Sequence, residues 1–233
     1  MSLTLEQVKS KSSARLKGLH PVVLAATTAL IERCYARGVP IIITQGLRTI
    51  AEQDALYAQG RTKSGSVVTN AKGGTSYHNY GLAIDFALLL PDGKQVSWDL
   101  KRDGDGDKVA DWTEVVREAK SLGFEWGGDF VSIKDAPHLQ MTFGLTTTQL
   151  RAGAKPDETK MAIVKAKIER YMKECEDVKV DKANTVVNGE KLKEGSVLIE
   201  GRTYVPLAAI GKALGANVSF DNETKTATIT TIK

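Results

Sequence analysis

The chain has 233 residues, enough for one full domain and a small second one. Hydrophobic residues make up 42% of it and charged residues 26%, as in ordinary soluble proteins, and no apolar run approaches the ~20 residues that span a bilayer. The net charge of +4 is too small to indicate a nucleic-acid-binding protein, and no recognition-helix pattern accompanies it. Neither a nucleic-acid partner nor membrane insertion is therefore expected.

The N-terminal segment imitates a signal peptide, because basic residues precede the apolar stretch Pro21–Ile31. Glu6 lies within that leader and no small-residue cleavage site follows, so we expect an amphipathic helix ended by Gly38 instead. The two cysteines, Cys34 and Cys175, match no disulfide framework or metal pair. These features predict synthesis in a reducing cytoplasm without an export signal of the chain's own.

The pattern of residues 1–150 predicts helix, strand, helix, loop, strand, acidic loop, helix and strand, which is an α+β domain. Val39–Gln45 is predicted to be a buried strand, and Ala51–Gln59 a short helix ended by Gly60. After the acidic loop, Asp111–Leu122 is predicted to be helical.

Two further segments alternate between apolar and polar or small side chains, as strands do. Along Leu82–Ala87 the polar or small face carries Asp85, and along His138–Phe143 it carries His138 and Gln140. Both strands are therefore predicted to present these side chains on a front face, with an apolar face behind.

The chain has three histidines, and two of them, His78 and His138, occur with acidic residues at short offsets. Two imidazoles and one carboxylate, here Asp85, hold a zinc ion and leave its fourth position open for water. Asp135 lies three residues before His138 and can approach the metal without binding it, which suits a general base. His20 has no acidic companion, and we expect it to be structural.

Three other residues near these segments have competing interpretations. Arg48 follows the buried strand, where it would stabilise an oxyanion or bind a substrate carboxylate; a surface ion pair is the alternative. Glu125 and Asp129 are alternatives to Asp135 as the base, unless they only solvate a loop or form a turn.

The acidic loop before Asp111 has oxygen donors at offsets 1, 3, 5, 7, 9 and 12, the positions that ligate calcium in an EF-hand loop. The usual glycine at offset 6 is replaced by Lys108, and no entering helix is evident, so an acidic solvated turn is the alternative. The candidate calcium ligands are Asp103, Asp105, Asp107, Val109 (through its carbonyl), Asp111 and Glu114.

Composition changes after residue 150. Residues 151–177 are predicted to be a helical linker, with an apolar stripe over Glu158–Glu176 that indicates packing against another surface. Residues 178–233 contain short strands, a predicted turn at Asn188-Gly189 and a helix at Leu207–Leu214, which indicates a separate small α+β module.

The first domain resembles the LAS superfamily of peptidoglycan peptidases, which includes VanY-like D-Ala-D-Ala carboxypeptidases and CwlK-like L-Ala-D-Glu endopeptidases. The resemblance covers roughly residues 20–145 and includes the segment around Arg48 and Gln53. It implies a small antiparallel sheet with flanking helices, zinc on the three ligands above, and stem-peptide hydrogen bonds from Gln53 and Ser76. The matching motif residues are Ser76, His78, Gly81, Ala83 and Asp85, followed by Asp135 and His138.

The tail from about Asn184 resembles the copper amine oxidase N-terminal-like module, in Val-Asn-Gly-Glu-Lys-Leu and Gly-Arg-Thr-Tyr-Val-Pro-Leu. Such modules are appended to bacterial wall and surface proteins, which implies wall binding or a stalk. Residues 178–233 contain no His, Cys or Met, so soft copper ligation is not supported.

Together the residues and the resemblances predict a monomeric zinc metallopeptidase that hydrolyses the peptide stem of bacterial peptidoglycan. The Asp-x-Pro-His form of the second motif resembles the CwlK-like and phage-endolysin branch, which implies cleavage of the L-alanyl-D-glutamate bond. An endolysin-type lytic enzyme that reaches the wall after release is the expected setting. A D-Ala-D-Ala carboxypeptidase and a non-catalytic wall-binding protein are the alternatives.

Overall fold

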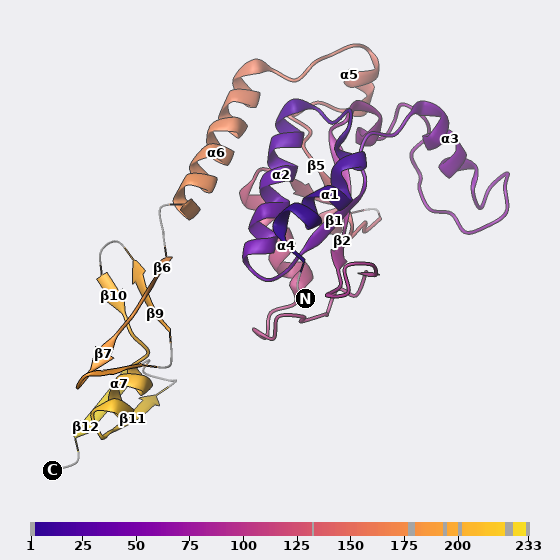
Figure 1. The fold of residues 1–233 in the computed structure, drawn as a ribbon. Helices are drawn as coiled ribbons and strands as arrows, with labels where there is room; N and C mark the ends of the chain where they lie inside the picture. The colour runs from indigo at the N-terminus through magenta and orange to yellow at the C-terminus, as the bar shows by residue number, and fades with distance from the viewer. Residues whose placement is uncertain are drawn as a thin grey trace. The chain divides into compact units, whose positions relative to one another are not determined.

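The computed structural model divides the chain into two compact units, Met1–Met172 and Lys173–Lys233 (Figure 1). The predicted start of the C-terminal module at Val178 lies outside the residues that the structure describes. The boundaries expected from the sequence, at residues 150 and 177, stay a prediction. The structure describes residues 3–131, 133–176, 180–192, 195–199, 202–221 and 226–231.

Two helices rather than one form the N-terminal region: α1 (Leu5–Leu16) and α2 (Pro21–Ala36). The sequence analysis did not separate α1, which begins at a Thr4 capping box. The chain breaks before Pro21 because a residue that precedes proline is disfavoured in the helical region, and His20 is extended there with ψ of 137°.

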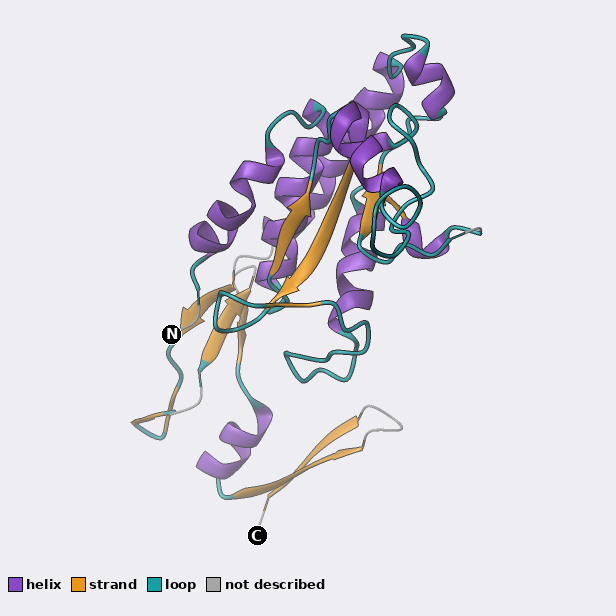
Figure 2. Cartoon of the chain, turned by 90° about the vertical axis from the view of Figure 1, so that its right-hand side faces the viewer, coloured by secondary structure: helices purple, strands orange, loops and turns teal. Residues whose placement is uncertain are grey.

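The first unit is built around a five-stranded sheet in which β2 is central and every strand pair is antiparallel. Its order is β1-β2-β5-β4, and β3 pairs with the far end of β2. Figure 2 draws the strands in orange and the helices beside them in purple. The small antiparallel sheet with flanking helices confirms the predicted fold class. The strands are β1 (Ile41–Gln45), β2 (Ala83–Leu89), β3 (Val96–Ser97), β4 (Glu125–Trp126) and β5 (His138–Gln140).

The core of this unit lies between the sheet and the pair of helices α2 and α4 (Asp111–Ser121). Phe86 of β2 is fully buried, and its ring centroid lies 4.5 Å from that of Trp112 on α4. Burying a side chain of this size contributes about 1.5–3 kcal/mol, so such contacts hold the sheet in place. The sheet then serves as a rigid base for the side chains on its other face.

Shorter elements connect the strands of the first unit. In Figure 1, α3 and the loop that follows it extend away from the other helices of the unit. A capping box at Thr49 starts α3, in agreement with the helix predicted there. These elements are α3 (Ile50–Ala58), the 3-10 turns η1 (Tyr77–Tyr80) and η2 (Gly127–Asp129), and α5 (Thr147–Arg151).

Helix α6 (Glu158–Glu176) packs on the first unit along the apolar stripe seen in the sequence. Ile168 is buried, and the Tyr171 hydroxyl donates to Glu118 Oε2 at 2.7 Å. Glu118 is itself 1% exposed and also pairs with Arg33, whose guanidinium lies 5.1 Å from the centre of the Tyr171 ring. This buried polar contact fixes α6 against α2 and α4.

In its described residues, the second unit contains small antiparallel sheets and the helix α7 (Leu207–Ala213). The predicted turn at Asn188-Gly189 joins β7 to β8, and both residues have positive φ, as a tight two-residue hairpin needs. Its strands are β6 (Val180–Ala183), β7 (Val186–Val187), β8 (Glu190–Lys191), β9 (Ser196–Ile199), β10 (Arg202–Tyr204), β11 (Ala216–Asp221) and β12 (Thr226–Thr231).

Candidate metal centre

Three side chains from different elements converge on the front of the sheet. Asp85 on β2 and His138 on β5 are directly opposite each other in the strand register. His78 comes from η1, which ends at Gly81 with φ of 64°; a Cβ there would lie 2.6 Å from the Gly18 carbonyl oxygen. Only glycine therefore allows η1 to pack this close and bring His78 to the two strands.

The three donor atoms form a nearly equilateral triangle. His78 Nε2, His138 Nδ1 and Asp85 Oδ1 are each 3.2 Å from the other two. A tetrahedral zinc ion with bonds of about 2.0–2.1 Å requires ligand atoms about 3.3 Å apart, so the spacing fits zinc. Both histidines are buried, and the Asp85 side chain is 20% exposed.

The far nitrogen of each imidazole determines which nitrogen can bind a cation. His78 Nδ1 lies 2.8 Å from the Gly46 carbonyl, which only accepts, so Nδ1 carries the proton and Nε2 presents a lone pair. His138 Nε2 lies 3.0 Å from Gln140 Oε1, and the Gln140 amide nitrogen donates to Glu125 Oε2, which fixes the amide orientation. His138 Nδ1 therefore also presents a lone pair.

When both imidazoles are neutral, two lone pairs and a carboxylate oxygen therefore face one another. Three acceptors at 3.2 Å repel one another unless a cation lies among them. Histidines that bind a metal ion through one ring nitrogen usually form a hydrogen bond through the other, and both imidazoles here have such a bond. Gly46, Gln140 and Glu125 supply that support; the carbonyl of Gly46 has no signal in the sequence, because any residue has one.

Burial and the neighbouring basic side chains have opposite effects on the pKa of Asp85. Burial raises the pKa of Asp85, but hydrogen bonds and charge from His138 and His78 outweigh it and hold that pKa below its usual value. Arg48 adds positive charge, with its Nη2 atom 3.6 Å from Asp85 Oδ2. Asp85 is therefore ionised at neutral pH, as a metal ligand must be.

Arg48 is held in place by Gln53. The Arg48 guanidinium donates to Gln53 Oε1 at 2.7 Å, and the Gln53 amide donates to the Ala71 carbonyl at 2.8 Å. Gln53 is fully buried, so both ends of its amide are used inside the protein. In this structure Gln53 positions Arg48, whose side chain remains 12% exposed; the expectation that Gln53 contacts substrate stays a prediction.

Asp135 lies on the loop that enters β5, next to the triangle. A Cβ on Gly127 would lie 2.4 Å from the Asp135 carbonyl oxygen and 2.9 Å from His138 Cβ, so glycine is needed for the two loops to meet. Partial burial of the carboxyl and the negative charge of Asp85 raise the pKa of Asp135, while His138, His78 and Arg48 lower it less. A carboxyl with a raised pKa beside a metal site suits proton transfer.

The alternatives to Asp135 are engaged elsewhere. Glu125 accepts from the Gln140 amide and from the Thr142 hydroxyl, at 3.0 and 2.7 Å, and so lies behind His138. Asp129 is exposed and pairs with Lys120 on α4 at 2.6 Å. The Ser76 hydroxyl accepts from the His78 backbone nitrogen at 3.4 Å and is half-buried, so its own proton remains available for a ligand.

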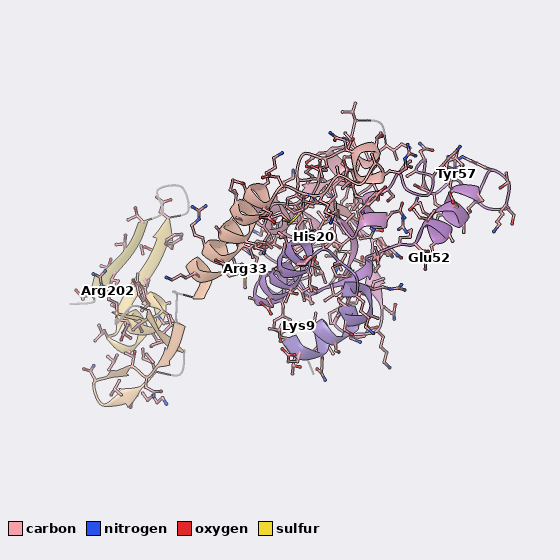
Figure 3. All side chains as sticks on the ribbon, turned by 90° about the horizontal axis from the view of Figure 1, so that it is seen from above. Lys9, His20, Arg33, Glu52, Tyr57 and Arg202 are labelled. Carbon is pink, nitrogen blue, oxygen red and sulfur yellow. The ribbon has the colours of Figure 1, made fainter. Side chains whose placement is uncertain are left out.

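The remaining sequence candidates lie away from this triangle. His20 begins α2, where its Nδ1 accepts from the Val22 backbone nitrogen at 3.4 Å, the structural role expected of it (Figure 3). The acidic loop forms two groups of carboxylates that share Asp105 and whose oxygens lie within 4.8 Å of one another. The first group is Asp103, Asp105 and Asp111, and the second is Asp105, Asp107 and Glu114.

Comparison with protein families gives two matches. Residues 69–141, which hold all three donors of the triangle, match a family described as D-alanyl-D-alanine carboxypeptidase. Residues 146–233 match a family described as copper amine oxidase N-terminal domain. Within the part of the chain that the structure describes, no helix is both long enough and apolar enough to cross a membrane.

Individual proteins are also similar to this chain. The peptidoglycan L-alanyl-D-glutamate endopeptidase CwlK of Bacillus subtilis (strain 168) is 54% identical over 123 residues, 53% of this chain and 73% of the relative. The L-alanyl-D-glutamate peptidase of Listeria phage A118 is 35% identical over 146 residues, 62% of this chain and 46% of the relative. The crystal structure of the Serratia marcescens L-Ala D-Glu endopeptidase ChiX has a TM-score of 0.40 and 28% identity, over 57% of this chain and 88% of that one.

Proposed function

Because this chain belongs to the family of L-alanyl-D-glutamate peptidases, we propose that it is a zinc peptidase that cleaves that bond in the peptide stem of bacterial peptidoglycan. The observation that carries the zinc assignment is the 3.2 Å triangle of two imidazole lone pairs and one carboxylate oxygen. The relatives' reaction supplies the substrate.

His78, Asp85 and His138 would hold the metal. Zinc bound there would act as a Lewis acid on the scissile carbonyl and lower the pKa of water. Asp135, at the edge of the same site, accepts the proton of the attacking water and passes it to the leaving amine. Its raised pKa makes it a better proton acceptor than an ordinary aspartate.

Arg48 contributes a fixed positive charge beside the reacting bond. Burial lowers the pKa of its guanidinium, while the charges of Asp85 and Asp135 raise it, so Arg48 stays protonated. With one donor held by Gln53, the remaining N–H groups can stabilise an oxyanion or bind a substrate carboxylate. Ser76 is proposed to hydrogen-bond the stem peptide.

The bond cleaved is tested by product analysis. Digestion of purified peptidoglycan is expected to expose a D-glutamyl amine and to leave an L-alanyl carboxylate on the glycan. Mass spectrometry of the fragments, after labelling of new amines, identifies both ends. Digestion by the His138→Ala variant provides the background, since that protein lacks a zinc ligand.

The D-Ala-D-Ala carboxypeptidase remains the second candidate, because the family matched by residues 69–141 carries that description. It predicts free D-alanine as the sole product of the same digestion. A non-catalytic wall-binding protein predicts no new termini at all. The raised pKa of Asp135 beside the metal ligands argues against it, since a binding scaffold has no need of a proton acceptor there.

We propose that the C-terminal unit binds the cell wall and that the protein acts as a monomer. All three metal donors come from one chain, so the site needs no second copy. The second unit resembles modules of wall and surface proteins, and in the sequence its residues 178–233 lack His, Cys and Met for catalysis or copper binding.

Removal of the tail tests this targeting role. The truncation should end after Glu176 rather than after residue 150, because Ile168 and Tyr171 of α6 pack on the first unit. Residues 1–176 are expected to hydrolyse soluble stem peptides as fast as the full chain but to bind intact walls at least several-fold more weakly. Equal retention of both proteins in a wall-pelleting assay would remove the targeting role.

A further inference from the structure

The acidic loop before α4 has a structural feature that its charges alone do not explain. Glu114, in the first turn of α4, is only 6% exposed, and its Oε2 atom has no hydrogen-bond partner among the described residues. A buried carboxylate oxygen without a partner is costly, because the group has lost its water and gained nothing in return. The Glu114 carboxylate lies within 4.8 Å of carboxylate oxygens from Asp105 and Asp107.

From this geometry we propose that Asp105, Asp107 and Glu114 form the core of a calcium site, independent of the zinc centre. Calcium takes six to eight oxygen ligands at 2.3–2.6 Å, so two donors on opposite sides of one ion lie up to about 5 Å apart. The three carboxylates satisfy that limit. An all-oxygen donor set also selects a hard cation over zinc or copper.

Two basic side chains near the acidic loop, Arg37 and Arg102, form ion pairs with Glu118 and Asp111. Of the two, Arg102 pairs with one of the candidate ligands, Asp111, at 3.3 Å. Burial and the negative charges of Asp107 and Asp105 raise the pKa of Glu114, and the positive charge of Arg37 lowers it less. A cation among Asp105, Asp107 and Glu114 removes that repulsion.

The loop already has the backbone form that a calcium loop needs. Lys108, at the position where such loops use glycine, has φ of 72°, the left-handed conformation that glycine otherwise supplies. Asp103 shares the first carboxylate group with Asp105 and Asp111 and accepts from the Gly106 and Lys108 backbone nitrogens. Asp103, Asp111 and the Val109 carbonyl complete the oxygen set as the loop closes on the ion.

The site joins the loop to a helix of the core. Trp112, Val115 and Ala119 of α4 are buried against the first unit, and Glu114 lies in the same helix. Calcium that bridges Glu114 to the loop therefore stabilises α4 and the unit that it packs on. Binding is expected to raise the thermal midpoint of the first unit by about 5–10 °C at saturating millimolar calcium.

Calorimetry tests the site directly. Calcium is titrated into the full-length protein after dialysis into calcium-free buffer, with zinc content measured before and after. We expect a saturable heat close to one equivalent and the rise in thermal midpoint. Extracellular calcium modules have dissociation constants of up to about 1 mM. Absence of both the heat and the rise in thermal midpoint at about 5 mM calcium would therefore overturn the proposal.

Three variants show where the ion binds. Glu114→Gln and Asp105→Asn keep side-chain shape and are each expected to weaken calcium binding by about tenfold or more. Glu158→Gln is the matched control, because Glu158 is also in the first turn of a helix but is exposed and far along the chain. Unchanged calcium binding in both loop variants would overturn the assignment, and zinc content and peptide hydrolysis report separately on the proposed peptidase site.

Discussion

Replacing His138 with alanine is expected to empty the zinc site and to reduce hydrolysis of peptidoglycan to background. The substitution removes one of the three donors. A catalytic zinc site uses three protein ligands, so His78 and Asp85 alone should not retain the ion. Metal analysis after dialysis should find about one zinc per wild-type chain and almost none in the variant.

The third histidine provides the control for this experiment. His20 lies at the start of α2, where it accepts from the Val22 backbone nitrogen. His20→Ala is expected to keep full zinc and activity and to lose about 1 kcal/mol of stability with the cap. Full zinc occupancy in His138→Ala would show that the metal binds elsewhere.

Asp135→Asn is expected to keep zinc and the fold while it lowers kcat by about 10²- to 10⁴-fold. Asparagine has nearly the same shape but cannot accept the proton of the attacking water. Kinetics on a soluble stem peptide measure the loss, and metal analysis with thermal unfolding shows that the site and the fold are intact.

Asp129→Asn is the matched control, because Asp129 is an acid on the same loop region that pairs with Lys120 at the surface. That variant is expected to retain nearly full activity. If Asp135→Asn hydrolysed the peptide at the wild-type rate, the proton acceptor would have to be another carboxylate, with Glu125 the first to examine. Glu125 already accepts two hydrogen bonds, which makes it the weaker candidate.

Local patterns in the sequence were enough to predict the strands that carry Asp85 and His138 and the face on which each side chain lies. Strand side chains alternate with a period of two, so a few residues determine which ones share a face. The same reasoning placed α6 and its apolar stripe, since a helical period is also local. Helix α1 was missed as a separate element, although Pro21 marked the break.

Only the tertiary structure decided how these pieces meet. His78 and His138 are 60 positions apart, and their nitrogens reach 3.2 Å because η1 packs against the strand pair at Gly81. The Gly46 carbonyl orients His78, and the Ala71 carbonyl accepts from the Gln53 amide that supports Arg48; both contacts join separate segments of the chain.

The burial of the Glu114 Oε2 atom also depends on tertiary packing. The sequence by itself determined which residue types lie on which strand or loop, because that information is local. Donor spacing, imidazole tautomers and the burial of single polar atoms depend on the packing of backbone segments far apart in the chain, which no short pattern records.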